Sequence, residues 1–246
     1  MSSVYTRLQG ENQPGAKWPI TYGIRKDNQF LMYKHEDKVT TADIDATISV
    51  TGEGDGIKVS ASLFQNFHTP VDLAEGDVLT ATSGSESITL SGSGGHYYGL
   101  LEVAPDPGTE VTVSLDRETA DDATTSTATL PEPVHVRSPA SRAAFDPAKE
   151  LVLTVDDQPG DLHVTWTGSC VISGDDFAAG ATTTTTTIAI PPGSVKLNEG
   201  QGDRCTVAFD VIRERQGSLD GAYDKGSIAG RQHLELALRL RPGPTP

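Results

Sequence analysis

The residues best suited to chemistry in this chain are aspartates in turn-rich segments, because carboxylate oxygens are ligands that calcium prefers in proteins. The calcium candidates are Asp175 and Asp176, which follow Gly174, and Asp220 and Asp224, which lie four residues apart. Neither pair has the spacing of an EF-hand loop. Aspartate also stabilises turns and is well hydrated in loops. We therefore favour turn formation at both pairs, keep calcium as the alternative, and predict no other cofactor.

Catalytic side chains show no recognisable arrangement in the sequence. The six histidines form no HExxH motif and no pair with the i, i+4 spacing of a helical zinc site. No serine lies in a GxSxG motif. We predict that the protein is not an enzyme, and we assign no catalytic residue.

The only two cysteines, Cys170 and Cys205, each adjoin a run in which apolar and polar residues alternate. In the run LHVTWT, Leu162, Val164 and Trp166 point to one side of a strand. We predict a Cys170–Cys205 disulfide that ties two strands of a β-sandwich beside a buried tryptophan. A buried pair of free thiols is the alternative. Disulfides persist in oxidising compartments, so the prediction favours an exported protein.

The charge of the chain limits its partners. The 246 residues include 34 acidic and 19 basic side chains, which gives a formal net charge of -15. This charge repels nucleic-acid phosphates and anionic lipid headgroups, so we predict no nucleic-acid partner. No apolar run approaches the roughly 20 residues of a membrane span, so we predict no transmembrane segment. The opening MSSVY has no signal-peptide pattern, and with the disulfide we expect a mature, exported region without its native signal.

The elements that would position these residues are short strands. The 25 glycines, 15 prolines and abundant threonine and serine favour strands and turns over helices. Alternating runs recur about every 8–12 residues, which is typical of a sandwich or barrel. We predict an all-β fold of two antiparallel β-sandwiches in tandem. Residues 1–41 are predicted to be an N-terminal extension or hairpin arm that packs on the first sandwich and has strands at ITYGI and FLMY. Residues 42–138 are predicted to form the first sandwich. Residues 139–246 are predicted to form the second sandwich, which contains the disulfide.

Longer segments resemble known bacterial proteins. RSPASRAAFDPAKELVLTV, followed by VTWTGSC, resembles the opening of a bacterial immunoglobulin-like domain, with Ser138, Pro139, Phe145 and Trp166 at the matching positions. VDLAEGDVLTAT, GTEVTVSLDR and DRCTVAFDVIRERQGSLDGAYDKGSIAGRQ are similar to segments of gammaproteobacterial lipoproteins of unknown function. The resemblance implies that the second sandwich is immunoglobulin-like, and it implies no catalytic residues. Those lipoproteins normally begin with a signal peptide and a lipid-acceptor cysteine, and neither is seen in this sequence.

The sequence supports two hypotheses about function. The first is a non-enzymatic binding or structural module of the cell envelope or cell surface, derived from a lipoprotein, that contacts protein or glycan through loops and sheet edges. We expect it in the periplasm, on the outer-membrane surface or outside the cell. The alternative is a subunit of an ordered assembly, a phage particle or an extracellular filament, in which the N-terminal arm adds a strand to a neighbouring copy.

Overall fold

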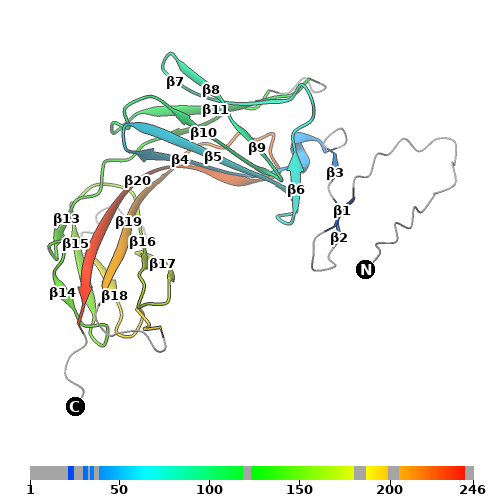
Figure 1. The fold of residues 1–246 in the computed structure, drawn as a ribbon. Coiled ribbons are helices and arrows are strands. Elements are labelled where there is room, and N and C mark those ends of the chain that lie inside the picture. Colours follow the sequence, from blue (N-terminus) through cyan, green and yellow to red (C-terminus); the bar gives the residue numbers. More distant parts are fainter. Residues whose placement is uncertain are drawn as a thin grey trace, which may run out of the picture.

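The computed structural model describes residues 22–24, 30–32, 34–35, 39–118, 123–179, 187–198 and 205–241, with side chains from residue 39 onward except those of 175–179. Its strands form two β-sandwiches that meet at a bend (Figure 1). The predicted all-β fold of antiparallel sandwiches is therefore confirmed. Within the described ranges, no helix has the length and apolar character needed to cross a membrane.

The first sandwich follows a 3-10 turn at Thr41–Asp43. Its strands in this part of the chain are β4 (Asp45–Glu53), β5 (Gly56–Gln65), β6 (Thr69–Asp72), β7 (Val78–Ser83), β8 (Glu86–Thr89), β9 (Ser91–Ser93), β10 (His96–Leu101), β11 (Glu110–Asp116) and β12 (Ser126–Thr129). Burial alternates along β4, β5 and β11, as expected for strands with one face on a core.

The second sandwich begins after a linker at residues 131–135. Its strands are β13 (Val136–Ser138), β14 (Ala144–Phe145), β15 (Leu151–Val155), β16 (Asp161–Thr167), β17 (Gly174–Ala179), β18 (Thr187–Ile190), β19 (Thr206–Gln216) and β20 (Lys225–Leu240). β20 is the longest strand described, with 16 residues, whereas most strands have about 3–10.

One sheet runs through both sandwiches, because β20 pairs with strands of each. From Lys225 to Arg231 it lies parallel to β4, and from Ala229 to Arg239 it lies antiparallel to β19. The resulting order is β17-β16-β19-β20-β4-β5-β10-β9. A four-stranded sheet, β12-β11-β7-β8, covers this shared sheet in the first sandwich, and a three-stranded sheet, β13-β15-β18, covers it in the second. In Figure 1 the shared sheet lines the inside of the bend.

Two hydrophobic clusters fill the sandwiches, and they do not divide the chain at residue 138. The first cluster takes most of its residues from β4 to β12, but it also includes Tyr223 and Ile228. The second begins at Val134 and ends at Leu240. The range 139–246, predicted as the second sandwich, therefore contributes to both cores, since the first half of β20 completes the sheet of the first sandwich.

The first two N-terminal strands form a small arm that is drawn apart from the first sandwich (Figure 1). β1 (Tyr22–Ile24) and β2 (Phe30–Met32) lie within the ITYGI and FLMY segments and pair antiparallel with each other. β3 (Lys34–His35) then joins the first sandwich by pairing in parallel with β6. Trp18 and the other residues before Tyr22 lie outside the described ranges.

A fragment of residues 39–138 should fail to fold cooperatively, because it lacks the first half of β20 and leaves β4 without its parallel partner. We expect no cooperative thermal transition by circular dichroism and poor dispersion in the amide NMR spectrum. The matched control is the chain from residue 39 to residue 241, which keeps β20 and should melt cooperatively. A well-dispersed spectrum from the short fragment would show that the first sandwich folds without β20.

Candidate functional site

The carboxylate of Asp220 accepts hydrogen bonds from backbone N–H groups of two neighbouring segments. Its Oδ2 accepts a hydrogen bond from the Thr125 N–H at 2.6 Å, and its Oδ1 accepts one from the Ala222 N–H at 2.8 Å. The Asp220 N–H in turn donates to Ser126 Oγ at 3.0 Å. These bonds tie the loop before β20 to the start of β12, so this aspartate fixes the entry of β20 into the first sandwich.

Of the other calcium candidates, only Asp224 has a described side chain. Asp224 Oδ2 lies 3.2 Å from the Lys225 Nζ in an exposed ion pair. Asp175 and Asp176 lie in β17, where the side chains fall outside the described part. Where side chains are described, no three His, Cys, Asp or Glu residues are grouped so that they could hold a metal ion. In the structure, Asp220 is hydrogen-bonded to its loop and Asp224 is paired with Lys225.

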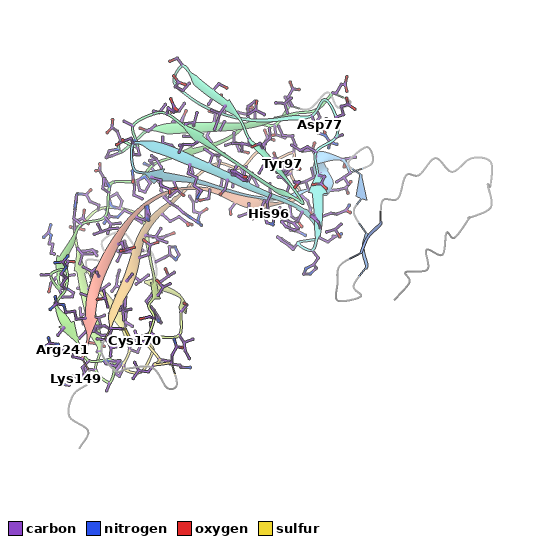
Figure 2. The ribbon with its side chains drawn as sticks, viewed as in Figure 1. Asp77, His96, Tyr97, Lys149, Cys170 and Arg241 are labelled. Carbon is purple, nitrogen blue, oxygen red and sulfur yellow. A yellow bond between two sulfur atoms is a disulfide. The ribbon has the colours of Figure 1, made fainter. Side chains whose placement is uncertain are left out.

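The predicted disulfide between Cys170 and Cys205 is present, with 6.1 Å between the two Cα atoms. It joins the chain after β16 to the residue before β19, and these two strands are neighbours in the shared sheet. Cys170 lies at the end of the second sandwich that is far from the first (Figure 2). The bridge therefore closes the free end of the β16–β19 pair, while the other end of the pair reaches the bend.

Trp166 is buried, as predicted, and belongs to the same hydrophobic cluster as Cys170. Its ring lies near the ring of Phe209, with centroids 6.3 Å apart, and Phe209 packs edge-on against Phe145. Gly174 lies against the indole, where a Cβ atom would approach the Trp166 ring to 2.1 Å. Only glycine leaves enough room at this position for the tryptophan to enter the core.

A buried ion pair fixes the junction between the sandwiches. Arg213 is the largest fully buried side chain described, and its Nη2 lies 2.8 Å from Asp156 Oδ1. Its Nη1 donates to the carbonyl oxygens of Pro133 at 2.8 Å and Glu132 at 3.2 Å. Because residues 132 and 133 belong to the linker, one guanidinium holds the linker, β19 and the end of β15 together.

Asp156 is itself hydrogen-bonded to the same linker. Its Oδ1 accepts a hydrogen bond from the His135 N–H at 3.1 Å, and its N–H donates to the His135 carbonyl at 3.0 Å. Burial of the carboxyl opposes its ionisation, but the hydrogen bonds from Arg213 and His135 and the charge of Arg213 outweigh burial and lower the pKa of Asp156. The carboxylate is therefore ionised at neutral pH and neutralises the buried guanidinium.

The sequence contains a signal for this pair, although neither residue was among the predicted sites. Val207, Phe209, Val211 and Arg213 occupy successive inward positions of β19, so the alternation places a charged side chain in the core. A charge on the buried side of a strand requires a partner of opposite charge. Asp156, in the turn after β15, fills that role.

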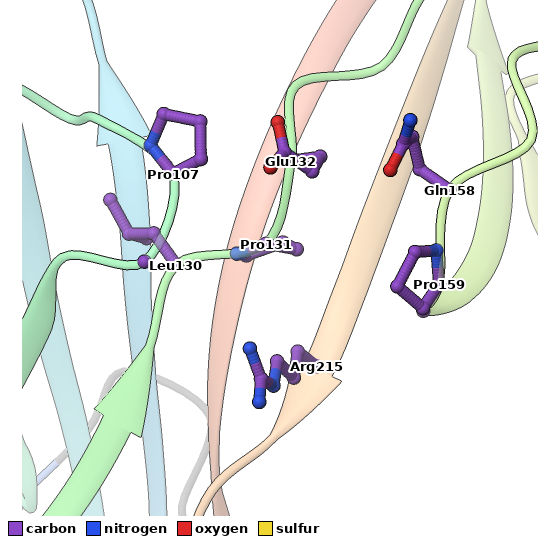
Figure 3. A pocket seen from close by; sticks show the side chains of 9 residues that line it. Pro107, Leu130, Pro131, Glu132, Gln158, Pro159 and Arg215 are labelled. Carbon is purple, nitrogen blue, oxygen red and sulfur yellow. The ribbon is translucent and has the colours of Figure 1, made fainter.

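A cavity of about 390 Å³ lies beside the ion pair on the linker side of the junction. Pro107 and Leu130 of the first sandwich face Pro159 of the second across it, with Pro131 and Arg215 between them (Figure 3). The cavity is the gap left where two rigid turns meet the linker. Its proline-rich lining keeps the backbone there stiff.

A larger apolar groove, which we call the β10 groove, opens at the edge of the first sandwich. It has a volume of about 690 Å³ and is lined chiefly by Glu53, Lys58, Ile88, Thr89, Tyr98 and Leu100. Tyr98 is 62% exposed and Leu100 is 55% exposed, although both lie in a strand. Adjacent Tyr97 and Leu101 point into the core, so the alternation of β10 directs Tyr98 and Leu100 outward.

Comparison with known proteins gives only architectural likenesses. No protein-family model and no curated protein matches the chain. A biofilm-associated protein BSP domain matches 86% of this chain at 14% identity and a TM-score of 0.28, and the chain spans 32% of that structure's length. The FN1–FN3 domains of chicken CNTN1 match 85% of this chain and 71% of theirs, at 9% identity and a TM-score of 0.28. An I-band fragment of titin matches 76% of this chain and 62% of its own, at 12% identity and a TM-score of 0.24.

Replacing Cys170 and Cys205 together with serine should lower the free energy of unfolding by about 3–4 kcal/mol, since the bridge closes a long loop in the unfolded chain. Denaturant unfolding of the oxidised protein and the double variant measures the difference. Reduction of the wild type should reproduce the loss. Equal stability of the two proteins, or two titratable thiols in the denatured, unreduced wild type, would contradict the bridge.

Replacing Asp156 with asparagine should lower the free energy of unfolding near neutral pH by about 3 kcal/mol, because the guanidinium of Arg213 would stay buried beside a neutral amide. Since folding lowers the pKa of Asp156, the stability it contributes is present above the unfolded-state pKa and is lost as the pH falls through the folded-state pKa. Urea unfolding at a series of pH values should show the difference from wild type shrinking below about pH 4.

The control for this change is Asp224→Asn, which removes an ion pair whose side chains are 44% and 60% exposed. It should change the free energy of unfolding by less than about 1 kcal/mol. A double variant with Asp156→Leu and Arg213→Met removes both buried charges and should recover part of the lost stability. An Asp156→Asn protein with wild-type stability and acid dependence would refute the role of the pair.

Proposed function

We propose that the chain is a non-enzymatic binding or structural module, exported to the cell envelope or cell surface, that contacts protein or glycan through its loops and sheet edges. The observation that carries this proposal is the shared sheet. Because β20 belongs to both sandwiches, their strands are hydrogen-bonded into one sheet across the bend. A scaffold of this kind holds its loops and sheet faces at fixed positions, which is what a binding or spacer module requires.

The chemistry of the shared sheet supports a polar partner. On its uncovered side, β4 presents Thr47 and Ser49, which pair across the strands with Ser62 and Ser60 of β5. These hydroxyl groups can both donate and accept hydrogen bonds. Tyr98 of β10 lies opposite Ser60 and adds an exposed aromatic ring to the same side. Hydroxyls beside an aromatic ring suit the hydroxyl groups and apolar faces of a sugar, and they suit a polar protein surface.

The disulfide supports export, since such bonds persist in oxidising compartments. Together with the resemblance of several segments to gammaproteobacterial lipoproteins, it supports an origin in an envelope lipoprotein. We include that origin in the proposal.

The second candidate is a subunit of an ordered assembly, such as a phage particle or an extracellular filament, joined by strand addition. The N-terminal arm favours it: β1 and β2 pair with each other and with no other described strand. A two-stranded hairpin is only marginally stable by itself in water, so such an arm gains stability by joining another sheet.

Labelled chain added to intact cells of the kind that produces it tests the first candidate. We expect saturable binding to the cell surface, lost after periodate oxidation if the partner is a glycan and after protease treatment if it is a protein. Changing Ser49 and Ser60 to glutamate places charge on the uncovered side of the sheet and should weaken binding about tenfold or more, or by at least ~1.4 kcal/mol.

The matched control is Val152→Glu, which adds a charge at an exposed strand position of the second sandwich, outside the shared sheet. It should bind like the wild type. Absence of saturable binding, or equal loss in the control, would refute the proposed use of this sheet face.

A further inference from the structure

The edge of the shared sheet is incomplete at β10. β9 pairs with only the first half of β10, from His96 to Tyr98. On its other side β10 pairs with β5 along its whole length, to Leu101. Among the described strands, none lies beside the second half of β10 on the β9 side. The chain passes from β8 to β9 through Leu90, whose N–H donates to the Leu79 carbonyl in the opposite sheet. β8 therefore diverges from β10, and the β10 groove lies between them.

The backbone at this edge points toward the groove. The Leu63 N–H of β5 donates to the Gly95 carbonyl at 2.7 Å, which makes Gly95 and Leu63 a hydrogen-bonded pair. In an antiparallel ladder, residues bond alternately to one neighbour and to the other. Gly99 therefore bonds to β5, and the N–H and carbonyl of Leu100 face the side where β9 has ended. Another strand could be bonded at this position.

The side chains around this edge are suited to pack against apolar residues of an added strand. Leu100 and Tyr98 are mostly exposed, and Ile88 of β8 lines the groove beside them. The rim carries an ion pair between Lys58 and Glu53, with 3.6 Å between Nζ and Oε2. A free backbone edge beside an apolar groove is the arrangement that binds an added strand: backbone bonds give affinity, and the groove selects side chains.

The N-terminal arm, residues 22–32, is the occupant that the chain itself supplies. Its strands contain Ile24 and the run Phe30–Met32, so it offers short apolar segments in extended conformation. The predicted extension 1–41 carries six basic and four acidic residues, whereas the rest of the chain carries 13 and 30. The extension that contains the arm therefore carries a net positive charge in an acidic protein, and charge favours its contact with the body of another copy.

The arm and the groove lie at opposite ends of the first sandwich. The arm extends beyond the end where β6 lies (Figure 1). Leu100 pairs with Lys58, close to the turn that joins β4 and β5, and that turn lies at the other end. The placement makes a second copy the source of the strand.

We propose that the β10 groove binds the N-terminal arm of a second copy, with an arm strand added beside Leu100 where β9 ends. The inference rests on the second candidate function and names its acceptor site. Each copy then has one arm and one groove on different surfaces, so the contact is head-to-tail and produces rings or open chains of subunits.

Sedimentation velocity of the full chain over a wide concentration range tests this. The wild type should form dimers and larger species, and Leu100→Arg should remain monomeric with an unchanged melting temperature because the side chain is exposed. The matched control is Val152→Arg, an exposed apolar strand residue elsewhere, which should assemble like the wild type.

A chain starting at residue 39 should be monomeric. A synthetic peptide of residues 20–35 should bind it, and at least about tenfold more weakly when Leu100 is arginine.

Cross-linking identifies the contact directly. A Leu100→Cys chain mixed with a Leu31→Cys chain should give a disulfide-linked dimer containing one of each, identified by peptide mass spectrometry. A wild type that stays monomeric at every concentration would overturn the inference, and so would a Leu100→Arg protein that assembles normally. Neither result affects the cell-binding test, so the first candidate function stands or falls separately.

Discussion

The structure depends on one buried ion pair at the point where the two sandwiches meet. Arg213 reaches Asp156 and two carbonyl oxygens of the linker from the inward side of β19. Its charge could not remain in the core without these partners. The same strand pairs with β20, which continues into the sheet of the first sandwich. The linker, the turn after β15 and the shared sheet are thereby held in one arrangement.

This arrangement explains where the exposed features of the protein lie. The disulfide closes the far end of β16 and β19, so the strand pair that carries Arg213 is restrained at both ends. No described strand covers the hydroxyl-rich side of β4 and β5, because the smaller sheets lie on the outside of the bend (Figure 1). The β10 groove arises for a related reason, since the chain crosses between sheets at Leu90 and leaves the edge of β10 short of a partner.

Much of this architecture could be predicted from alternation, because a period of two specifies which residues face a core. Trp166 and the Cys170–Cys205 bridge were predicted in this way. Alternation does not specify which strand lies beside which, and the parallel pairing of β20 with β4 joins segments far apart in the sequence. Turn formation was favoured for Asp220, and in the structure its carboxylate accepts hydrogen bonds from backbone N–H groups. Alternation could have placed Arg213 in the core, but it does not specify that Asp156 is the partner.

Residue-resolved hydrogen exchange of β20 tests the central claim most directly, because each half of that strand belongs to a different sandwich. If one sheet runs through both, amides from Ile228 to Arg231 should be protected by as much free energy as those from Leu234 to Leu238, and β4 amides should be protected with them. Rapid exchange in the first half of β20, with protection confined to the second, would show that the sandwiches do not share a sheet.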